Sequence, residues 1–158
     1  NDTAPGEIGQ MIVKGPNGCR YLDDIDRQKA YIRDGWNLSG DLCIRDEEGY
    51  FSYEARTDDM ILTGGYNVYP AEVERVVAGH PDVALVAVGS IPDLEKGELA
   101  KAYIVPKTGT QPDTENVIAY CREHLAAYKV PRAVQFVDDL PKTSTGKVMR
   151  RELKKLDK

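Results

Sequence analysis

The chain has 158 residues, of which 41% are hydrophobic and 30% charged, and its formal net charge is −5. This length fits one large domain or two small ones, and the acidic balance argues against a nucleic-acid partner. No apolar run reaches the roughly 18 residues of a membrane-spanning helix, so no membrane partner is expected. The chain opens with NDTAPGEIGQ, which resembles the middle of a protein and shows no signal peptide. We therefore expect a piece of a longer, cytoplasmic protein.

The cysteines and histidines do not form a metal-binding pattern. Cys19, Cys43 and Cys121 lack C-x-x-C spacing, and His80 and His124 lie far apart in the chain. A zinc site is not expected from such spacing. Buried free thiols in a reducing compartment are the simplest interpretation of the three cysteines.

The first 56 residues predict β structure. Residues 9–16 (GQMIVKGP) read as a short strand, and residues 26–36 (DRQKAYIRDGW) as a polar helical turn. Residues 40–56 (GDLCIRDEEGYFSYEAR) read as a hairpin, because two alternating stretches flank the turn DEEG.

The pattern changes near Asp58. Residues 58–70 (DDMILTGGYNVYP) predict a hairpin with Gly64 and Gly65 at its turn. Pro70 then suits the first turn of a helix that ends at Gly79. The apolar stripe of this helix consists of Val73, Val76 and Val77.

The rest of the chain alternates between strands and helices. Residues 83–90, 100–106 and 132–139 read as three strands. Residues 113–128 predict a helix whose apolar face holds Val117, Ile118, Cys121, Leu125 and Tyr128. A basic helix closes the chain, with Met149, Leu153 and Leu156 on one side. Together these elements predict an α+β unit of a hairpin and a three-stranded sheet with helices, preceded by an all-β segment.

Residues 140–153 (LPKTSTGKVMRREL) look at first like a phosphate-binding loop. A Walker loop needs Gly where Pro141 stands and Ser or Thr where Val148 stands, so we reject a nucleoside-triphosphate P-loop. What remains is a loop that presents Lys147 beside a helix. From the residues alone, a solvated surface loop is the favoured interpretation.

Acidic and basic side chains flank the change in pattern. Asp41 follows a Ser-Gly turn and could accept hydrogen bonds from vicinal hydroxyls, and Arg56 could hold an oxyanion. The alternatives are turn chemistry for Asp41 and a surface ion pair for Arg56. The adjacent Asp58 and Asp59 have no evident third ligand, which favours a domain junction over a metal site.

Three motifs in this order resemble one family. SGD at residues 39–41, ARTDDMILTGGYNVYPAEVE at 55–74 and LPKTSTGKVMRREL at 140–153 are similar to the adenylate-forming superfamily of acyl-CoA synthetases, nonribosomal adenylation domains and luciferases. The resemblance covers nearly the whole chain. It implies that residues 1–57 are the β-rich end of the large AMP-binding domain, and that residues 58–158 are the small, mobile C-terminal lid domain.

The resemblance also implies roles for single residues. Asp41 would bind the ATP ribose, Arg56 would contact the nucleotide, and Asp58 would be the hinge. Gly64 and Gly65 would line the coenzyme A tunnel, and Lys147 would be the catalytic lysine. Two departures from the family motifs, Ser39 for Thr and Ala55 for Gly, leave these side chains unchanged.

The reaction implied is the ATP-dependent joining of a carboxylic acid to coenzyme A through an acyl-adenylate. The family's phosphate loop does not occur here, so Mg²⁺ with ATP would be held by the missing N-terminal domain and the chain alone would be inactive. Benzoate and 2-aminobenzoate ligases are the subgroup most resembled. The alternatives are a medium-chain fatty acyl ligase, a non-catalytic binding module with this fold, and regulation by acetylation of Lys147.

Overall fold

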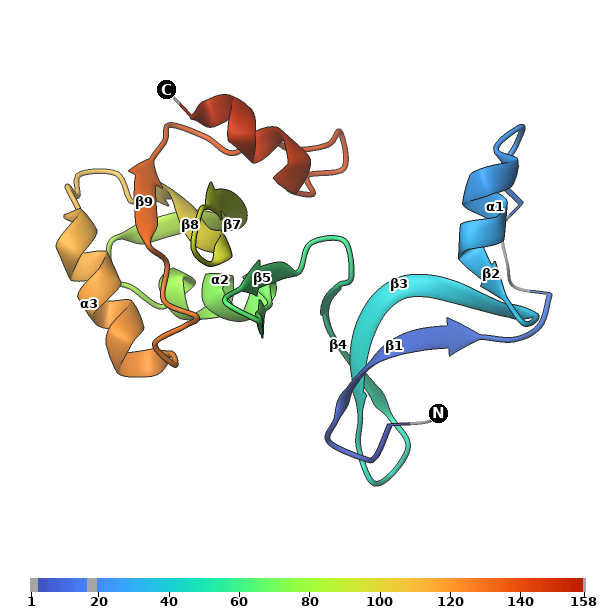
Figure 1. Cartoon of the computed structure of the whole chain (residues 1–158). Helices are drawn as coiled ribbons and strands as arrows, with labels where there is room; N and C mark the ends of the chain where they lie inside the picture. The colour runs from blue at the N-terminus through green and yellow to red at the C-terminus, as the bar shows by residue number, and fades with distance from the viewer. Residues whose placement is uncertain (1–2, 17–19, 158) are drawn as a thin grey trace. The chain divides into compact units, whose positions relative to one another are not determined.

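The computed structural model describes residues 3–16 and 20–157 (Figure 1). Within the chain, contacts define two compact units, Asn1–Asp58 and Asp59–Lys158. Strands dominate the first unit, and the second mixes strands and helices, so the predicted α+β class is confirmed. Cys19, one of the three thiols predicted to be buried, lies outside the described residues. The other two, Cys43 and Cys121, are free and buried.

The first unit is built around one long strand. β3 (Trp36–Arg45) pairs antiparallel with β1 (Ile8–Val13), with β2 (Ile32–Arg33) and with β4 (Phe51–Arg56). The predicted hairpin is β3–β4, closed by a hydrogen bond from the Asp46 N–H to the Tyr50 carbonyl. The predicted helical turn is α1 (Ile25–Tyr31), whose first turn is capped by the Asp24 carboxylate.

The second unit contains a five-stranded sheet. Its order is β6 (Tyr66–Val68), β5 (Ile61–Thr63), β8 (Gly97–Pro106) and β7 (Val83–Asp93), and β9 (Ala133–Phe136) lies parallel beside β8. The predicted hairpin is β5–β6. A bridge between Thr63 and Gly97 adds this hairpin to the three predicted strands, so the sheet is one continuous structure.

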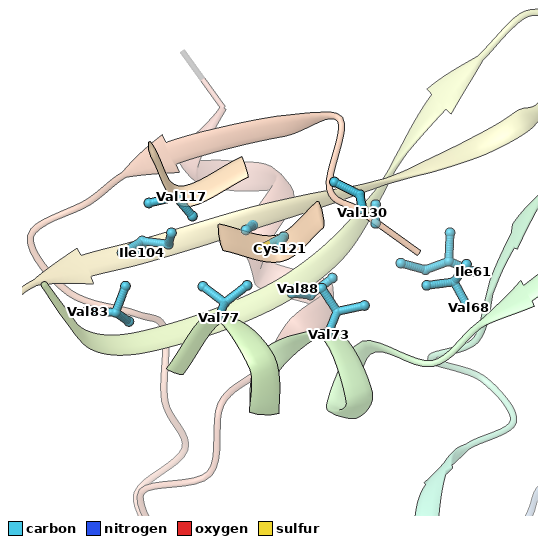
Figure 2. Packing of buried hydrophobic residues seen from close by; sticks show 12 residues of the cluster. Ile61, Val68, Val73, Val77, Val83, Val88, Ile104, Val117, Cys121 and Val130 are labelled. Carbon is cyan, nitrogen blue, oxygen red and sulfur yellow. The ribbon is translucent and has the colours of Figure 1, made fainter. Parts of the chain in front are cut away.

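Helices cover both faces of this sheet (Figure 1). α2 (Pro70–Ala78) and α3 (Thr114–His124) pack on one face, where Figure 2 shows the buried side chains that meet between them. The 3-10 helix η1 (Arg150–Leu156) covers the other face through a second cluster. Neighbouring residues of a strand serve opposite faces, as Ala87 and Val88 do, because side chains alternate along a strand. Each fully buried valine contributes about 1.5–3 kcal/mol to this core.

Two predicted helices differ from those observed. α3 ends at His124 because Leu125 is extended, with φ −125° and ψ 150°, and packs against the core outside the helix. Tyr128 therefore lies beyond the helical face on which it was predicted. The closing helix is 3-10 and begins only after Met149, so Met149 does not share its side. Leu153 and Leu156 do share one side, since they lie three residues apart and a 3-10 helix has about three residues per turn.

No helix among residues 3–16 and 20–157 combines the length and apolarity that crossing a membrane requires.

Candidate functional site

Lys147 lies on a tightly closed turn. The Thr143 N–H donates to the Lys147 carbonyl at 2.8 Å, and the Lys147 N–H donates back to the Thr143 hydroxyl at 3.1 Å. Gly146 occupies the left-handed region with φ +82°, where glycine is unstrained. A bridge between Lys142 and Val148 closes the base of the turn. The exposed Lys147 side chain therefore projects from a backbone with a defined shape.

Apolar anchors hold both ends of this lysine loop (residues 141–149). Leu140 before it and Leu153 after it are 3% and 1% exposed. Both pack with Ala87 and Tyr103 on the η1 face of the sheet. The loop is thus mounted on the folded second unit, with its cationic side chain directed to solvent.

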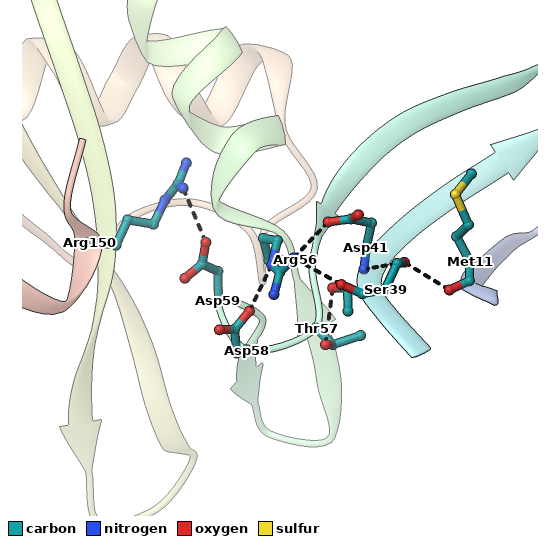
Figure 3. Close-up of polar contacts among 9 residues, drawn as sticks. Met11, Ser39, Asp41, Arg56, Thr57, Asp58, Asp59 and Arg150 are labelled. Atoms are coloured by element: carbon teal, nitrogen blue, oxygen red, sulfur yellow. Dashed lines mark hydrogen bonds and ion pairs between the residues drawn. The ribbon is translucent and has the colours of Figure 1, made fainter. Parts of the chain in front are cut away.

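A second cluster, in the first unit, brings together three of the predicted residues (Figure 3). Arg56 donates from Nη1 to Asp41 Oδ1 at 2.9 Å and from Nε to Asp58 Oδ1 at 3.1 Å. Its Nη1 also donates to the Ser39 carbonyl at 3.1 Å. Burial by itself lowers the pKa of Arg56, but the hydrogen bonds to Asp58 and Asp41 outweigh it and raise the pKa above its ordinary value. The guanidinium therefore stays charged.

Asp41 and Arg56 are both partly exposed, at 34% and 41% of their side chains. The surface ion pair that the sequence left open as an alternative is therefore present. It places a carboxylate beside a permanent cation on neighbouring strands, β3 and β4. Such a pair can accept from hydroxyls and donate to an oxyanion at one position.

Gly40 is needed for this arrangement. Its φ is +77°, and a Cβ atom built there would lie 2.8 Å from Arg56 Nη2. The glycine in the SGD stretch thus lets the guanidinium lie directly against the β3 backbone.

The adjacent carboxylates Asp58 and Asp59 bind different arginines. Asp58 accepts from Arg56 of the first unit, whereas Asp59 Oδ2 accepts from Arg150 Nη1 of the second at 3.1 Å. In the part of the chain that the structure describes, no three His, Cys, Asp or Glu side chains are grouped to hold a metal ion. The two carboxylates lie at the boundary of the two units.

Gly64 and Gly65 form the two-residue turn of the β5–β6 hairpin. Both have positive φ, +55° and +85°, as the mirror-image turns of tight hairpins require. Both are exposed, and no atom within 4 Å would meet a side chain added at Gly65. The turn therefore presents bare backbone that an extended ligand could approach closely.

One polar network was missed by the sequence interpretation. Arg150 donates from Nη2 to Glu74 Oε2 at 2.7 Å and from Nε to Glu74 Oε1 at 3.3 Å, in addition to its bond to Asp59. Glu74 entered the sequence interpretation only as the last residue of the motif at 55–74. The sequence does show that Arg150 and the two acidic residues have opposite charges. However, Glu74 and Asp59 lie 76 and 91 positions before Arg150, and no local sequence pattern pairs residues so far apart.

Comparison with known proteins supports a specific family. Residues 72–147 match the family model of the AMP-binding enzyme C-terminal domain. The chain is 44% identical to a long-chain-fatty-acid–CoA ligase of Bacillus subtilis over 151 residues, which are 95% of this chain and 27% of the relative. It is 43% identical to a feruloyl-CoA synthase of an Amycolatopsis species over 152 residues, 96% of this chain and 31% of the relative. The chain thus spans less than a third of either protein.

A solved structure shows the same fold. The o-succinylbenzoate CoA synthetase of Bacillus subtilis, in complex with its acyl-adenylate intermediate, is similar with a TM-score of 0.85 and 37% identity. The similarity covers 96% of this chain and 31% of that one. The matched model covers most of the second unit and includes Glu74 and Lys147. The second unit of the chain therefore carries, over residues 72–147, the AMP-binding enzyme C-terminal domain.

Proposed function

We propose that this chain is the C-terminal part of an ATP-dependent carboxylate–CoA ligase. The observation that carries the proposal is the exposed Lys147 on a closed loop of a unit that belongs to the AMP-binding C-terminal family. The strong similarity of nearly the whole chain to two CoA ligases supports it. The remaining part of the protein would supply the acid pocket and the site for ATP with Mg²⁺.

Lys147 would serve the first half-reaction. A carboxylate oxygen attacks the α-phosphorus of ATP, pyrophosphate leaves, and negative charge develops on the reacting oxygens. An ammonium brought to this centre stabilises that charge and helps to exclude water. The long, exposed side chain suits a group that must enter for this step and leave afterwards.

The glycine turn would serve the second half-reaction. The thiol of coenzyme A attacks the acyl carbon, and AMP leaves. The pantetheine arm that carries this thiol would pass close to the backbone of the glycine turn. Gly64 and Gly65 offer a bare, exposed turn at the tip of β5–β6. Asp58, at the boundary of the two units, would be the hinge about which the second unit reorients from one half-reaction to the next.

Asp41 and Arg56 would bind the nucleotide. Asp41 would accept hydrogen bonds from the ribose hydroxyls, and Arg56 would hold a charged or hydroxyl oxygen beside it. Their ion pair keeps both groups oriented before the nucleotide arrives. Preorganised groups lose less entropy on binding than free ones.

For the acid substrate, we propose an aromatic carboxylate such as benzoate or 2-aminobenzoate. The fatty-acid alternative has its own support, since one relative is a long-chain-fatty-acid–CoA ligase. The feruloyl-CoA synthase and the o-succinylbenzoate synthetase support an aromatic acid. Assay of the full-length protein with benzoate, 2-aminobenzoate, octanoate and a long-chain fatty acid separates these alternatives by kcat/KM.

Substitution of Lys147 in the full-length protein tests the reaction assignment. Lys147→Ala should lower acid-dependent ATP–pyrophosphate exchange by about 10²- to 10³-fold, the usual effect of removing one preorganised donor. Thioester formation from a synthetic acyl-adenylate should persist. Lys142→Ala is the matched control, because Lys142 lies on the same loop and makes only a partly exposed ion pair with Asp139. Near-normal exchange by Lys147→Ala would refute the role of the lysine.

A further inference from the structure

Arg150 joins the lysine loop to two distant parts of the second unit. It lies three residues after Lys147, at the start of η1. Its Nη1 donates to Asp59 at the beginning of the unit, a contact drawn in Figure 3, while Nη2 and Nε both donate to Glu74 of α2. Three nitrogens of one planar guanidinium are thus used, which fixes its orientation as well as its position.

These ion pairs are more protected than ordinary surface pairs. The side chains of Arg150, Asp59 and Glu74 are only 26%, 21% and 18% exposed. Glu74 Oε1 also accepts the Val88 N–H at 2.9 Å, so this carboxylate is itself fixed between α2 and β7. Partly buried, multiply bonded pairs hold geometry better than exposed ones, which contribute little.

The network is the polar anchor that lies nearest to Lys147 in sequence. Leu140 and Leu153 hold the two ends of the loop by apolar contact, which restrains distance but sets no unique orientation. The guanidinium adds direction, because each of its hydrogen bonds has a required angle. Loss of Arg150 would leave the loop attached but free to tilt.

We infer that Arg150 is a positioning residue for Lys147. It locks the base of the lysine loop to Asp59, the residue that follows the proposed hinge, so that the loop and the start of the unit turn as one body. This inference rests on the proposed function, in which Lys147 serves adenylation only.

The glycine turn has separate anchors. The Gly64 N–H donates to the Lys96 carbonyl at 2.9 Å, and the Thr63 hydroxyl donates to the Glu98 carbonyl at 2.8 Å. The Leu62 N–H donates to the Glu98 carboxylate at 3.2 Å. Since none of these bonds involves Arg150, its loss should affect adenylation selectively and spare the thioester step.

Arg150→Gln in the full-length protein tests the inference. We expect kcat for acid-dependent ATP–pyrophosphate exchange to fall roughly 10- to 100-fold, the scale of a misplacement of about 1 Å at a reacting centre. The KM for ATP should change little, and thioester formation from a synthetic acyl-adenylate should remain near the wild-type rate. Arg150→Lys should restore only part of the pyrophosphate-exchange activity. Lysine keeps the positive charge, but its ammonium lacks the fork that reaches both carboxylates.

Arg132→Gln is the charge-matched control, since Arg132 is an exposed arginine of the same unit. It should leave both half-reactions unchanged. Unaltered ATP–pyrophosphate exchange in Arg150→Gln would overturn the inference. Equal losses in both half-reactions would also overturn it, because general destabilisation of the unit would explain them.

Amide hydrogen exchange gives a readout that does not depend on activity. The peptide covering residues 141–149 should exchange faster in Arg150→Gln than in wild type or Arg132→Gln. Unchanged protection of this peptide would contradict the anchoring itself. If the wild-type protein shows no acid-dependent pyrophosphate exchange, the proposed function fails, while the hydrogen-exchange result still decides whether Arg150 holds the loop.

Discussion

Leu153 provides the sharpest stability prediction. This side chain is 1% exposed and is the fully buried residue of η1. It packs with Ala87, Tyr103 and Leu140. Directly opposite is Gly89, which has no side chain: a Cβ atom built there would lie 3.4 Å from Leu153 Cδ1.

Leu153→Ala should therefore leave a cavity that its surroundings cannot fill. Buried Leu→Ala substitutions cost 2–5 kcal/mol, and the missing side chain at Gly89 argues for about 3 kcal/mol here. With a urea m-value of about 1–3 kcal/mol/M, the unfolding midpoint of the second unit should fall by about 1–3 M.

The two units can be followed separately. Trp36 is the single tryptophan of the chain and lies in the first unit, so its fluorescence reports unfolding of that unit. Far-UV circular dichroism reports mainly α2 and α3 of the second unit, each of which is longer than α1 of the first. In Leu153→Ala, only the unfolding midpoint seen by circular dichroism should shift. Leu94→Ala is the control: Leu94 is fully exposed, so its loss should change the free energy of unfolding by less than about 0.5 kcal/mol. A Leu153→Ala cost below about 1 kcal/mol would show that η1 is not docked on the sheet in solution.

Two further predictions concern ion pairs. Gly40→Ala should destabilise the first unit by more than the about 1–2 kcal/mol that alanine costs in the left-handed region, because its Cβ would also displace Arg56. Gly49→Ala is the control, because Gly49 has φ +92° and open space around it, so alanine there adds backbone strain alone. The free energy of unfolding of both variants is measured by Trp36 fluorescence. An equal loss of stability in the two variants would argue against displacement of Arg56. The hydrogen bond from Lys101 holds the pKa of Asp157 below its ordinary value, so the stability it contributes is present above that value and is lost as the pH falls through the lowered folded-state pKa. In Lys101→Gln, the urea midpoint of the second unit should already be lower at pH 6 and should fall less steeply than in wild type as the pH drops below the ordinary pKa of Asp157, because the folded-state pKa moves back toward the unfolded one. An unchanged pH dependence would contradict this account.

Local chemistry made the hairpins predictable. The turn residues DEEG and Gly64-Gly65 stand between alternating stretches, so turn chemistry and periodicity agree there. Pro70 at the first turn of α2 and the buried Val73 and Val77 followed from the same kind of local signal. These features depend only on residues close together in sequence.

The features that could not be predicted depend on tertiary contacts. The departure of Leu125 from α3 is favoured by packing against the core, and the 3-10 form of η1 suits docking of Leu153 opposite Gly89. The pairing of Arg150 with Asp59 and Glu74 joins residues that no periodicity relates. At the candidate site, motif order pointed to Asp41 and Arg56, while their direct ion pair was only an alternative.

The neighbouring carboxylates of Asp58 and Asp59 have a consequence for how the chain could swivel. One is tied to an arginine before it in sequence and the other to an arginine far after it. Torsion about the few backbone bonds between their Cα atoms would break neither tie. Each of the two neighbouring carboxylates thus has a cationic partner within its own unit, so the charges at this boundary are balanced on either side of it.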